Sequence, residues 1–294
     1  MIHVPLITPF GTDGQVDPAA LEALAHQVLD DGAAGLVALG TTAEAAALDP
    51  EERETVTAVV GRVCREHGAR FTLGAGAGDT RRAARELAAL AGLPVAPDAA
   101  LVTVPSFTRP GEAGVLAHFR ALAEASPVPL FVYHIPYRTG QALTAAALRE
   151  LAGIPGVAGV KYAAGGIDAE TVDLLGDHPD GFEILAGDDV FAPALLALGC
   201  HGGILASAHL ATDRWVRLAA GDGSGGPGAG TPARQRLGHR LAALAAAVFR
   251  EPNPVVVKAA LHAQGRIPTP AVRLPLLPAG LSSLAGALDA LDSL

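Results

Sequence analysis

Short apolar runs alternate with longer segments of helical periodicity along most of this chain. The apolar runs lie at residues 3–8, 35–39, 71–73, 99–104, 129–133, 156–161, 182–186 and 203–206. Each run has the length of a buried strand. Between the runs, apolar residues recur every three or four positions, as Leu21, Leu24 and Val28 do. The pattern therefore predicts eight strands, each followed by a helix.

Eight consecutive strand-helix units are typical of an α/β protein with the (β/α)8 TIM barrel fold. An open doubly wound sheet is the alternative, although such sheets usually have fewer strands and a switch point. We expect the barrel at residues 1–220, a Gly-rich surface loop at 221–232, and C-terminal helices at 233–294 that pack on the barrel. These last residues form a C-terminal helical extension.

Composition excludes several classes of protein. The net charge is −9 and no basic block is present, which argues against a nucleic-acid partner. No apolar run reaches the roughly 18 residues that a membrane span requires. Cys64 and Cys200 lie far apart, and the N-terminus lacks a basic segment before its first apolar run. We therefore expect a cytoplasmic protein.

Lys161 is one of only two lysines in the chain, and it lies at the end of the sixth predicted strand. Burial lowers the pKa of a lysine because it disfavours the charged ammonium, and the free amine is then a nucleophile. A Schiff-base lysine needs this property. Taken alone, the residue also fits a lysine that extends to solvent or pairs with a carboxylate.

Other reactive side chains follow the predicted strands, where the active sites of barrels lie. Thr41 and Thr42 follow the second strand, Tyr133 ends the fifth, and Arg138 follows Tyr133 in the next loop. An amine, a phenol that relays protons, and hydroxyl and guanidinium groups that hold carboxylates suit the chemistry of 2-keto acids. Each also has a purely structural interpretation: a helix cap, a core tyrosine or a surface ion pair.

The chain resembles the dihydrodipicolinate synthase / N-acetylneuraminate lyase family of pyruvate-dependent class I aldolases. The resemblance covers nearly the whole chain in family order. It is carried by Thr8-Pro9-Phe10, Gly40-Thr41-Thr42-Ala43-Glu44, Tyr133 to Gly140, Gly159-Val160-Lys161, Gly187-Asp188-Asp189, Asn253 to Lys258 and Arg273 to Pro278.

The resemblance implies a lyase that forms a Schiff base and condenses pyruvate with an aldehyde. Lys161 would form the imine, Tyr133 would relay protons and Thr41 would join the relay. Thr42 would bind the pyruvate carboxylate. Arg138 occupies the position that holds the aldehyde's carboxylate in the synthase branch of lysine biosynthesis, in which the aldehyde is aspartate semialdehyde.

The resemblance also implies that backbone carbonyls of Gly187 and Ile204 line the pocket. It implies a homo-oligomer, a dimer or most often a homotetramer. Neither a cofactor nor a metal is expected, because His201 and His209 have no third ligand at a sensible spacing. Lys258, the second lysine, is expected to form a structural ion pair.

Two departures from the family pattern concern the second substrate. Phe107 stands where the synthases have a tyrosine that reaches across a dimer interface into the relay, and His134 replaces the usual asparagine. Water or His134 would have to replace the tyrosine hydroxyl that Phe107 lacks. Two alternatives therefore stay open: a paralogous 2-keto-acid aldolase or dehydratase with another substrate, and a non-catalytic barrel that binds keto acids.

Overall fold

The structure is a computed structural model that describes residues 1–76, 78–220 and 231–294. Its strands form a closed barrel in sequence order, and the paired strands are parallel. The strands are β1 (Ile2–Pro5), β2 (Gly35–Ala38), β3 (Arg70–Ala75), β4 (Ala99–Thr103), β5 (Leu130–His134), β6 (Val157–Tyr162), β7 (Glu183–Ala186) and β8 (Gly202–Ile204). The predicted TIM barrel is confirmed, and the open sheet is excluded.

A helix follows each strand. The helices are α1 (Pro18–Asp30), α2 (Pro50–His67), α3 (Thr80–Ala88), α4 (Gly111–Ala125), α5 (Pro136–Thr139), α6 (Ala145–Ala152), α7 (Ala169–Gly176), α8 (Ala192–Ala197), α9 (Thr212–Ala220), α10 (Pro232–Val248), α11 (Val255–Ala263) and α12 (Leu281–Asp292). Asp17 and Asp49 cap α1 and α2, each accepting a hydrogen bond from a backbone N–H three residues later. The short helix α5 was not predicted.

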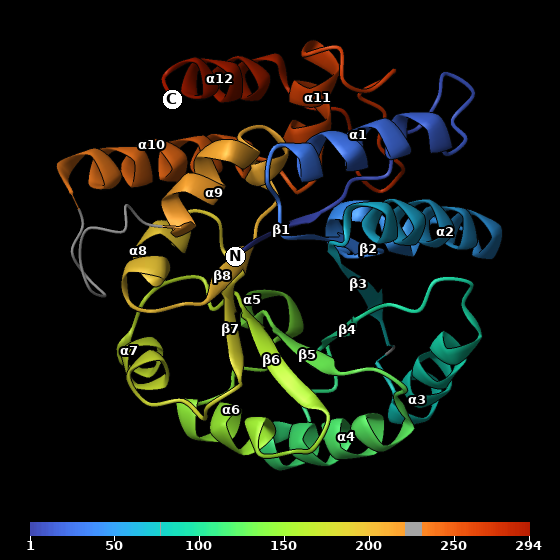
Figure 1. Cartoon of the computed structure of the whole chain (residues 1–294), viewed down its shortest axis with the longest axis vertical. Helices are drawn as coiled ribbons and strands as arrows, with labels where there is room; N and C mark the ends of the chain where they lie inside the picture. The colour runs from blue at the N-terminus through green and yellow to red at the C-terminus, as the bar shows by residue number, and fades with distance from the viewer. Residues whose placement is uncertain (77, 221–230) are drawn as a thin grey trace. The chain divides into compact units, whose positions relative to one another are not determined.

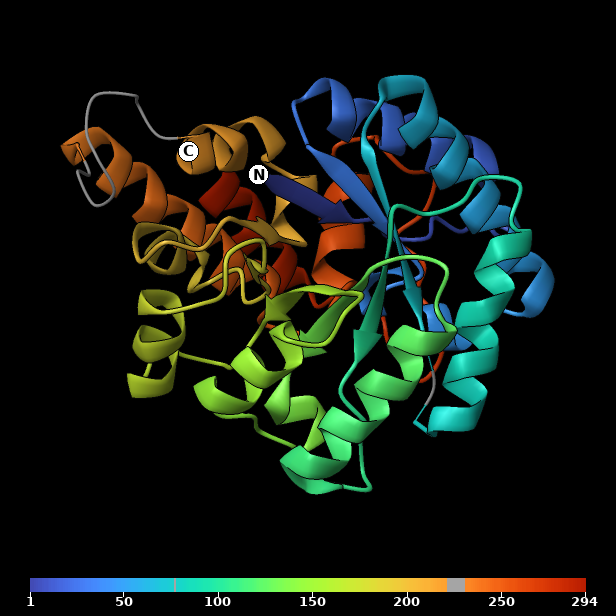
Figure 2. The same ribbon diagram turned by 60° about the horizontal axis from the view of Figure 1, so that its bottom comes forward.

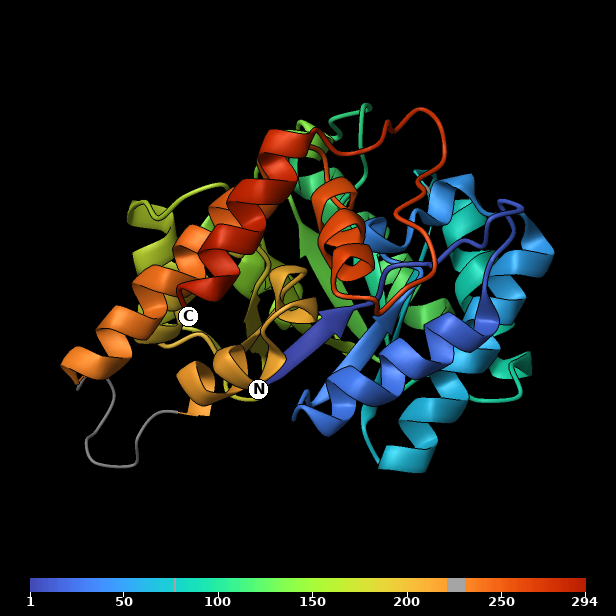
Figure 3. The ribbon, with the colours of Figure 1, turned by 90° about the horizontal axis from the view of Figure 1, so that it is seen from above.

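The chain divides into two compact units, Met1–Phe71 with Ile204–Leu294, and Thr72–Gly203. In the first unit, α1 packs against α2 (Figure 1). The C-terminal helices α10 and α12 of the same unit lie side by side (Figure 3). The C-terminal extension is therefore packed within the unit that contains β1 and β2.

In the second unit, helices cover the outer side of the strands. Helices α3, α4, α6 and α7 contact one another in that order (Figures 1 and 2). Strand β6 lies between β5 and β7, with Lys161 paired to Tyr133 on one side and to Leu185 on the other. The sheet register thus brings the predicted nucleophile and the predicted proton relay to neighbouring positions.

Gly159 allows β6 to pack closely. A Cβ at this position would overlap the carbonyl oxygen of Glu183 and the ring of Phe131. Only a glycine fits there without displacing one of them. Because Gly159 precedes Lys161 by two residues on the same strand, this contact also fixes the position of the lysine.

Part of the predicted surface loop at 221–232 lies outside the described residues. Thr231 caps α10 and Pro232 begins it. The division into a barrel, a loop and C-terminal helices stays a prediction. None of the helices in the described ranges is long and apolar enough to cross a bilayer.

Candidate active site

Lys161 lies near the end of β6 and is 7% exposed. Burial lowers its pKa to about 8, while the carboxylates of Asp189 and Asp188 oppose this shift and Arg138 adds to it. Its Nζ lies 4.4 Å from the centre of the Tyr133 ring. Across residues 1–76, 78–220 and 231–294, no ion pair of Lys161 is found. The lysine therefore neither extends to solvent nor pairs with a carboxylate.

The backbone at Gly187 lies directly against the Lys161 side chain. A Cβ at Gly187 would lie 2.8 Å from Cγ and 3.0 Å from Cε of Lys161. The Gly187 N–H donates to the Tyr162 carbonyl at 2.7 Å, which fixes this approach. Asp188 follows, and its Oδ2 accepts from the Gly165 N–H at 2.6 Å. Gly187 thus lies against the Lys161 side chain, while the predicted role of its backbone carbonyl in the pocket stays a prediction.

Tyr133 is 8% exposed and lies at the neighbouring position on β5. Burial raises the pKa of its phenol above the ordinary value, and the Arg138 guanidinium opposes this shift. The phenol is therefore neutral at physiological pH and can both donate and accept a hydrogen bond. A neutral hydroxyl beside a partly deprotonated amine is suited to proton transfer.

Arg138 lies on α5, three residues after Ile135, and is exposed. Its guanidinium carbon lies 5.7 Å from the centre of the Tyr137 ring. The positive charge influences the pKa values of both Tyr133 and Lys161. Arg138 is thus near the amine and accessible to solvent, which suits a residue that receives a carboxylate.

Thr41 and Thr42 lie in the first unit, in a short 3-10 turn (Thr41–Ala43) that follows β2. Thr41 is exposed, whereas Thr42 is only 4% exposed. The turn begins after Gly40 and has no side-chain cap. The interpretation of these threonines as a helix cap is therefore wrong. Instead, Oγ1 of Thr42 accepts a hydrogen bond from Nδ2 of Asn253 at 2.8 Å.

Residues of the C-terminal extension also form hydrogen bonds with Glu44, at the end of the same turn. Glu44 has a left-handed backbone with φ of 53°, and its Oε1 accepts from Nζ of Lys258 at 2.8 Å. Its Oε2 accepts from the Arg273 N–H, also at 2.8 Å. The expected ion pair of Lys258 is confirmed. Sequence motifs contained Asn253, Glu44 and Arg273, but no local signal revealed that they meet around Thr42.

Ile204 ends β8 in the first unit and is 2% exposed. Its carbonyl role stays a prediction. The structure thus places Lys161, Tyr133, Arg138 and Gly187 together in the second unit. Thr41, Thr42 and Ile204 belong to the first.

His134 does not face the amine. Successive side chains of a strand point to opposite faces, so His134 points away from the side of Tyr133. Its ring lies 5.5 Å from that of Tyr162, whose hydroxyl bonds to Thr171 on the outer helix α7. Burial lowers the pKa of His134 to about 4. The suggestion that His134 replaces the missing hydroxyl of the relay is therefore wrong.

Phe107 is 93% exposed and has a left-handed backbone, with φ of 65°. Its N–H donates to the Thr139 carbonyl at 3.3 Å, which ties the loop to α5. The ring therefore projects from the second unit into solvent, and it has no hydroxyl to contribute to proton transfer.

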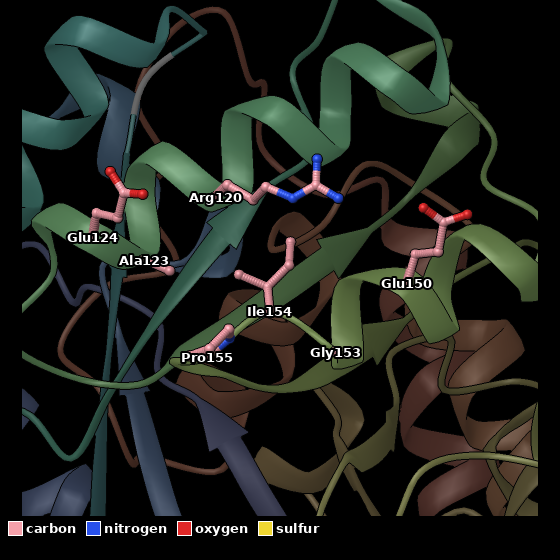
Figure 4. A pocket seen from close by; sticks show the side chains of 7 residues that line it. All are labelled: Arg120, Ala123, Glu124, Glu150, Gly153, Ile154 and Pro155. Atoms are coloured by element: carbon pink, nitrogen blue, oxygen red, sulfur yellow. The ribbon is translucent and has the colours of Figure 1, made fainter.

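A separate cavity of about 530 Å³ lies between α4 and the segment after α6 (Figure 4). Arg120 and Glu124 of α4 and Glu150 of α6 surround Ile154 there. None of the predicted site residues lines this cavity. Within the described ranges, no group of three or more His, Cys, Asp or Glu side chains is arranged to hold a metal ion.

Comparison with known proteins agrees with the resemblance noted in the sequence. Residues 1–291 match the dihydrodipicolinate synthetase family. The chain is 33% identical over 277 residues to 4-hydroxy-tetrahydrodipicolinate synthase 2 of Clostridium acetobutylicum, with 94% of each chain covered. It is 37% identical over 279 residues to 4-hydroxy-tetrahydrodipicolinate synthase of Synechococcus elongatus, covering 93% of this chain and 89% of the relative.

Solved structures show the same relationship. A dihydrodipicolinate synthase of Bacillus anthracis superposes with a TM-score of 0.90 at 26% identity, covering 100% of this chain and 98% of the other. The synthase of Acinetobacter baumannii, solved in complex with pyruvate, superposes with a TM-score of 0.88 at 32% identity, covering 99% and 98%. Sequence and structure thus agree over nearly the full length, and the chain belongs to the dihydrodipicolinate synthetase family.

Proposed function

We propose that the protein is a Schiff-base-forming lyase that condenses pyruvate with an aldehyde, as a 4-hydroxy-tetrahydrodipicolinate synthase of lysine biosynthesis. The observation that carries this proposal is the state of Lys161. Its amine is buried, has a pKa of about 8 and lies beside the Tyr133 ring. Such an amine is partly deprotonated near neutral pH and can attack a carbonyl.

The chemistry follows from this amine. Nζ of Lys161 forms a bond to C2 of pyruvate, and the former carbonyl oxygen takes up protons and leaves as water. The resulting imine withdraws electrons from the neighbouring methyl carbon, which loses a proton to give an enamine. That carbon then forms a bond to the aldehyde carbon, whose oxygen takes up a proton and becomes a hydroxyl. With aspartate semialdehyde as the acceptor, its amino group attacks the imine carbon, which closes the ring and releases the lysine amine. Tyr133, a neutral phenol, supplies and removes the protons, and Thr41 joins this relay.

Binding roles are assigned to the remaining predicted residues. Thr42 binds the pyruvate carboxylate through its hydroxyl and backbone N–H, and Arg138 binds the carboxylate of aspartate semialdehyde. Backbone carbonyls of Gly187 and Ile204 line the pyruvate site. The exposed position of Arg138, close enough to Lys161 to influence its pKa, supports its part in this assignment.

Two departures from the family pattern support a second candidate function. Phe107 lacks the hydroxyl that the synthases supply at this position, and His134 faces away from the amine. These two observations favour a paralogous 2-keto-acid aldolase or dehydratase that shares the imine chemistry. A non-catalytic barrel that only binds keto acids is disfavoured by the buried amine and its adjacent phenol.

The working form of the protein is proposed from family resemblance. It is a cytoplasmic homo-oligomer, a dimer or tetramer, without a cofactor or metal and without a nucleic-acid or membrane partner. The 93% exposed ring of Phe107 supports an assembled form, because a large apolar side chain gains stability when a second chain covers it.

Turnover with a set of acceptors tests the proposal. Purified protein and pyruvate are supplied with aspartate semialdehyde or, separately, with sugar-derived aldehydes; sugar-derived 2-keto acids are supplied alone. Product is followed by mass spectrometry, with Lys161→Ala as the control. We expect the highest kcat/KM with aspartate semialdehyde. A higher value with another substrate would establish the paralogous activity, and turnover of none would leave only binding.

A further inference from the structure

Asn253 is the only asparagine of the chain, and its side chain bonds to Thr42 from 211 positions away in sequence. Nδ2 of Asn253 lies 2.8 Å from Oγ1 of Thr42 and donates to it. Thr42 is 4% exposed, so little water competes for this hydroxyl. The contact lies entirely within the first unit and is made by the segment that precedes α11.

The turn that carries Thr42 is fixed independently of Asn253. The hydroxyl of Thr8 donates to the Ala43 carbonyl at 2.8 Å. Lys258 and the Arg273 backbone both bond to Glu44 at the end of the turn. The backbone therefore has several other supports. The Asn253 amide acts on one particular atom, the oxygen of the Thr42 side chain.

A donor at this oxygen determines where the hydroxyl hydrogen points. A threonine hydroxyl has one hydrogen and two acceptor lone pairs. When Nδ2 of Asn253 occupies a lone pair, the hydrogen is left for an acceptor elsewhere. A carboxylate is such an acceptor, because its oxygens accept hydrogen bonds and donate none. If the Asn253 position held a hydrogen-bond acceptor instead, the Thr42 hydroxyl would donate its hydrogen to that acceptor, and only its lone pairs would face the substrate.

The surroundings of the amide favour this donor orientation. Oδ1 of Asn253 is buried and has no hydrogen-bond partner among the residues whose positions are described. If the amide were reversed, Oδ1 would face Thr42, and the NH2 group would lie where Oδ1 now has no hydrogen-bond partner among the described residues. Buried N–H groups without partners are rarer than buried carbonyls without partners. The amide is thus held with its nitrogen toward Thr42.

We infer that Asn253 is a positioning residue that orients the Thr42 hydroxyl hydrogen toward the carboxylate of the keto-acid substrate. This inference rests on the proposed function, in which Thr42 binds that carboxylate. It gives the C-terminal extension an indirect part in substrate recognition, through the Thr42 hydroxyl. Asn253 acts through its hydrogen bond to Thr42 and takes no part in bond formation.

The decisive variant is Asn253→Asp, which keeps the size of the side chain and replaces the NH2 donor by an acceptor oxygen. We expect the KM for pyruvate to rise about 10- to 100-fold, since a charge-assisted hydrogen bond is lost. The change in kcat should be less than about threefold, because the imine chemistry is untouched. Asn253→Ala, which leaves the hydroxyl free to rotate, should raise KM by a smaller factor. Gln235→Glu, at an exposed position of α10, adds the same charge and should leave KM unchanged.

A double-mutant cycle separates orientation from general damage to the fold. In a Thr42→Val background there is no hydroxyl to orient, so Asn253→Ala should change the KM for pyruvate less than twofold. An equal effect of Asn253→Ala with and without Thr42 would overturn the inference. So would an unchanged KM in Asn253→Asp with its thermal unfolding midpoint preserved; if that variant does not fold, the cycle with Asn253→Ala decides.

Trapping of the wild-type protein with pyruvate and borohydride separates a failure of the Asn253 role from a failure of the proposed function. An adduct on Lys161 together with an unchanged KM in the variants would refute only the role of Asn253. Absence of any adduct on the wild-type protein would refute the proposed function, and the inference with it.

Discussion

Both lysines of this chain are buried, but only one of them is hydrogen-bonded to a carboxylate in the described parts of the chain. Lys258 is 0% exposed and donates to Glu44 at 2.8 Å, with the Phe10 ring 3.9 Å from its Nζ. Lys161 is 7% exposed, faces the Tyr133 ring and has no ion pair in the described parts of the chain. Burial lowers the pKa of both amines. At Lys258, however, a carboxylate in direct contact stabilises the charged form.

This difference shows what separates a structural lysine from a nucleophilic one. Burial alone does not distinguish them, because both are buried and both occur in sequence motifs of the family. The pKa does not distinguish them either, since burial lowers it to about 8 at each lysine. The bonded partner does: Lys258 donates to Glu44, whereas Asp188 and Asp189 act on Lys161 through their charge.

Replacement of Lys161 should abolish activity. In Lys161→Met no amine can form the imine, so we expect kcat/KM for pyruvate to fall by at least about 10⁴-fold. Lys258→Met should retain imine formation in whatever fraction of the protein stays folded. The measurement is steady-state turnover of the two variants. Comparable activity in Lys161→Met and the wild type would contradict the assignment.

The same substitution should change stability in opposite directions at the two sites. Lys258→Met leaves Glu44 buried without its partner and should lower the free energy of unfolding by about 3–5 kcal/mol. Lys161→Met removes a buried charge without a bonded partner and should raise it by about 1–2 kcal/mol. Urea unfolding measures both.

A matched double variant controls that comparison. Glu44→Gln keeps an oxygen for the Arg273 N–H and removes the unpaired charge, so Lys258→Met/Glu44→Gln should be more stable than Lys258→Met alone. Equal losses of stability at both lysines would mean that the contrast between them is wrong.

Gly187→Ala tests how closely the backbone confines Lys161. The new Cβ would lie 2.8 Å from Cγ of Lys161 and would displace its side chain. We expect kcat/KM for pyruvate to fall about 10- to 100-fold, because small displacements of a reacting group are costly. Gly166→Ala is the matched control, since a Cβ there meets nothing within 4 Å. Equal activity of the two variants would show that Gly187 does not position the amine.

The pH dependence of imine formation tests the lowered pKa of Lys161. Only the free amine attacks pyruvate, and the pKa of Lys161 is lowered from 10.5 to about 8. The kcat/KM for pyruvate should therefore rise about tenfold per pH unit below pH 8 and level off above it. A rise that continues toward pH 10 would indicate a lysine with an ordinary pKa.

The sequence predicted the barrel and the residues at the strand ends well, because both depend on local patterns. Strand length and helical spacing are local, and the register of β5 with β6 then brings Tyr133 and Lys161 together. The resemblance added the family, which comparison confirmed. The orientation of His134 also follows from a local pattern, the alternation of side chains along β5.

The rest of the site depends on contacts between distant parts of the chain. Asn253 with Thr42 and Lys258 with Glu44 are each separated by more than 200 positions. No periodicity or spacing reveals which residues of the C-terminal extension meet the turn after β2. Helix α5 has only four residues, too few for a helical pattern to be recognised.

The imine chemistry of Lys161 is tested most directly by intact-mass spectrometry after incubation of the protein with pyruvate and borohydride, followed by peptide mapping. We expect one stable adduct per chain, located on Lys161 and absent from Lys161→Ala. No adduct, or an adduct on Lys258, would contradict it.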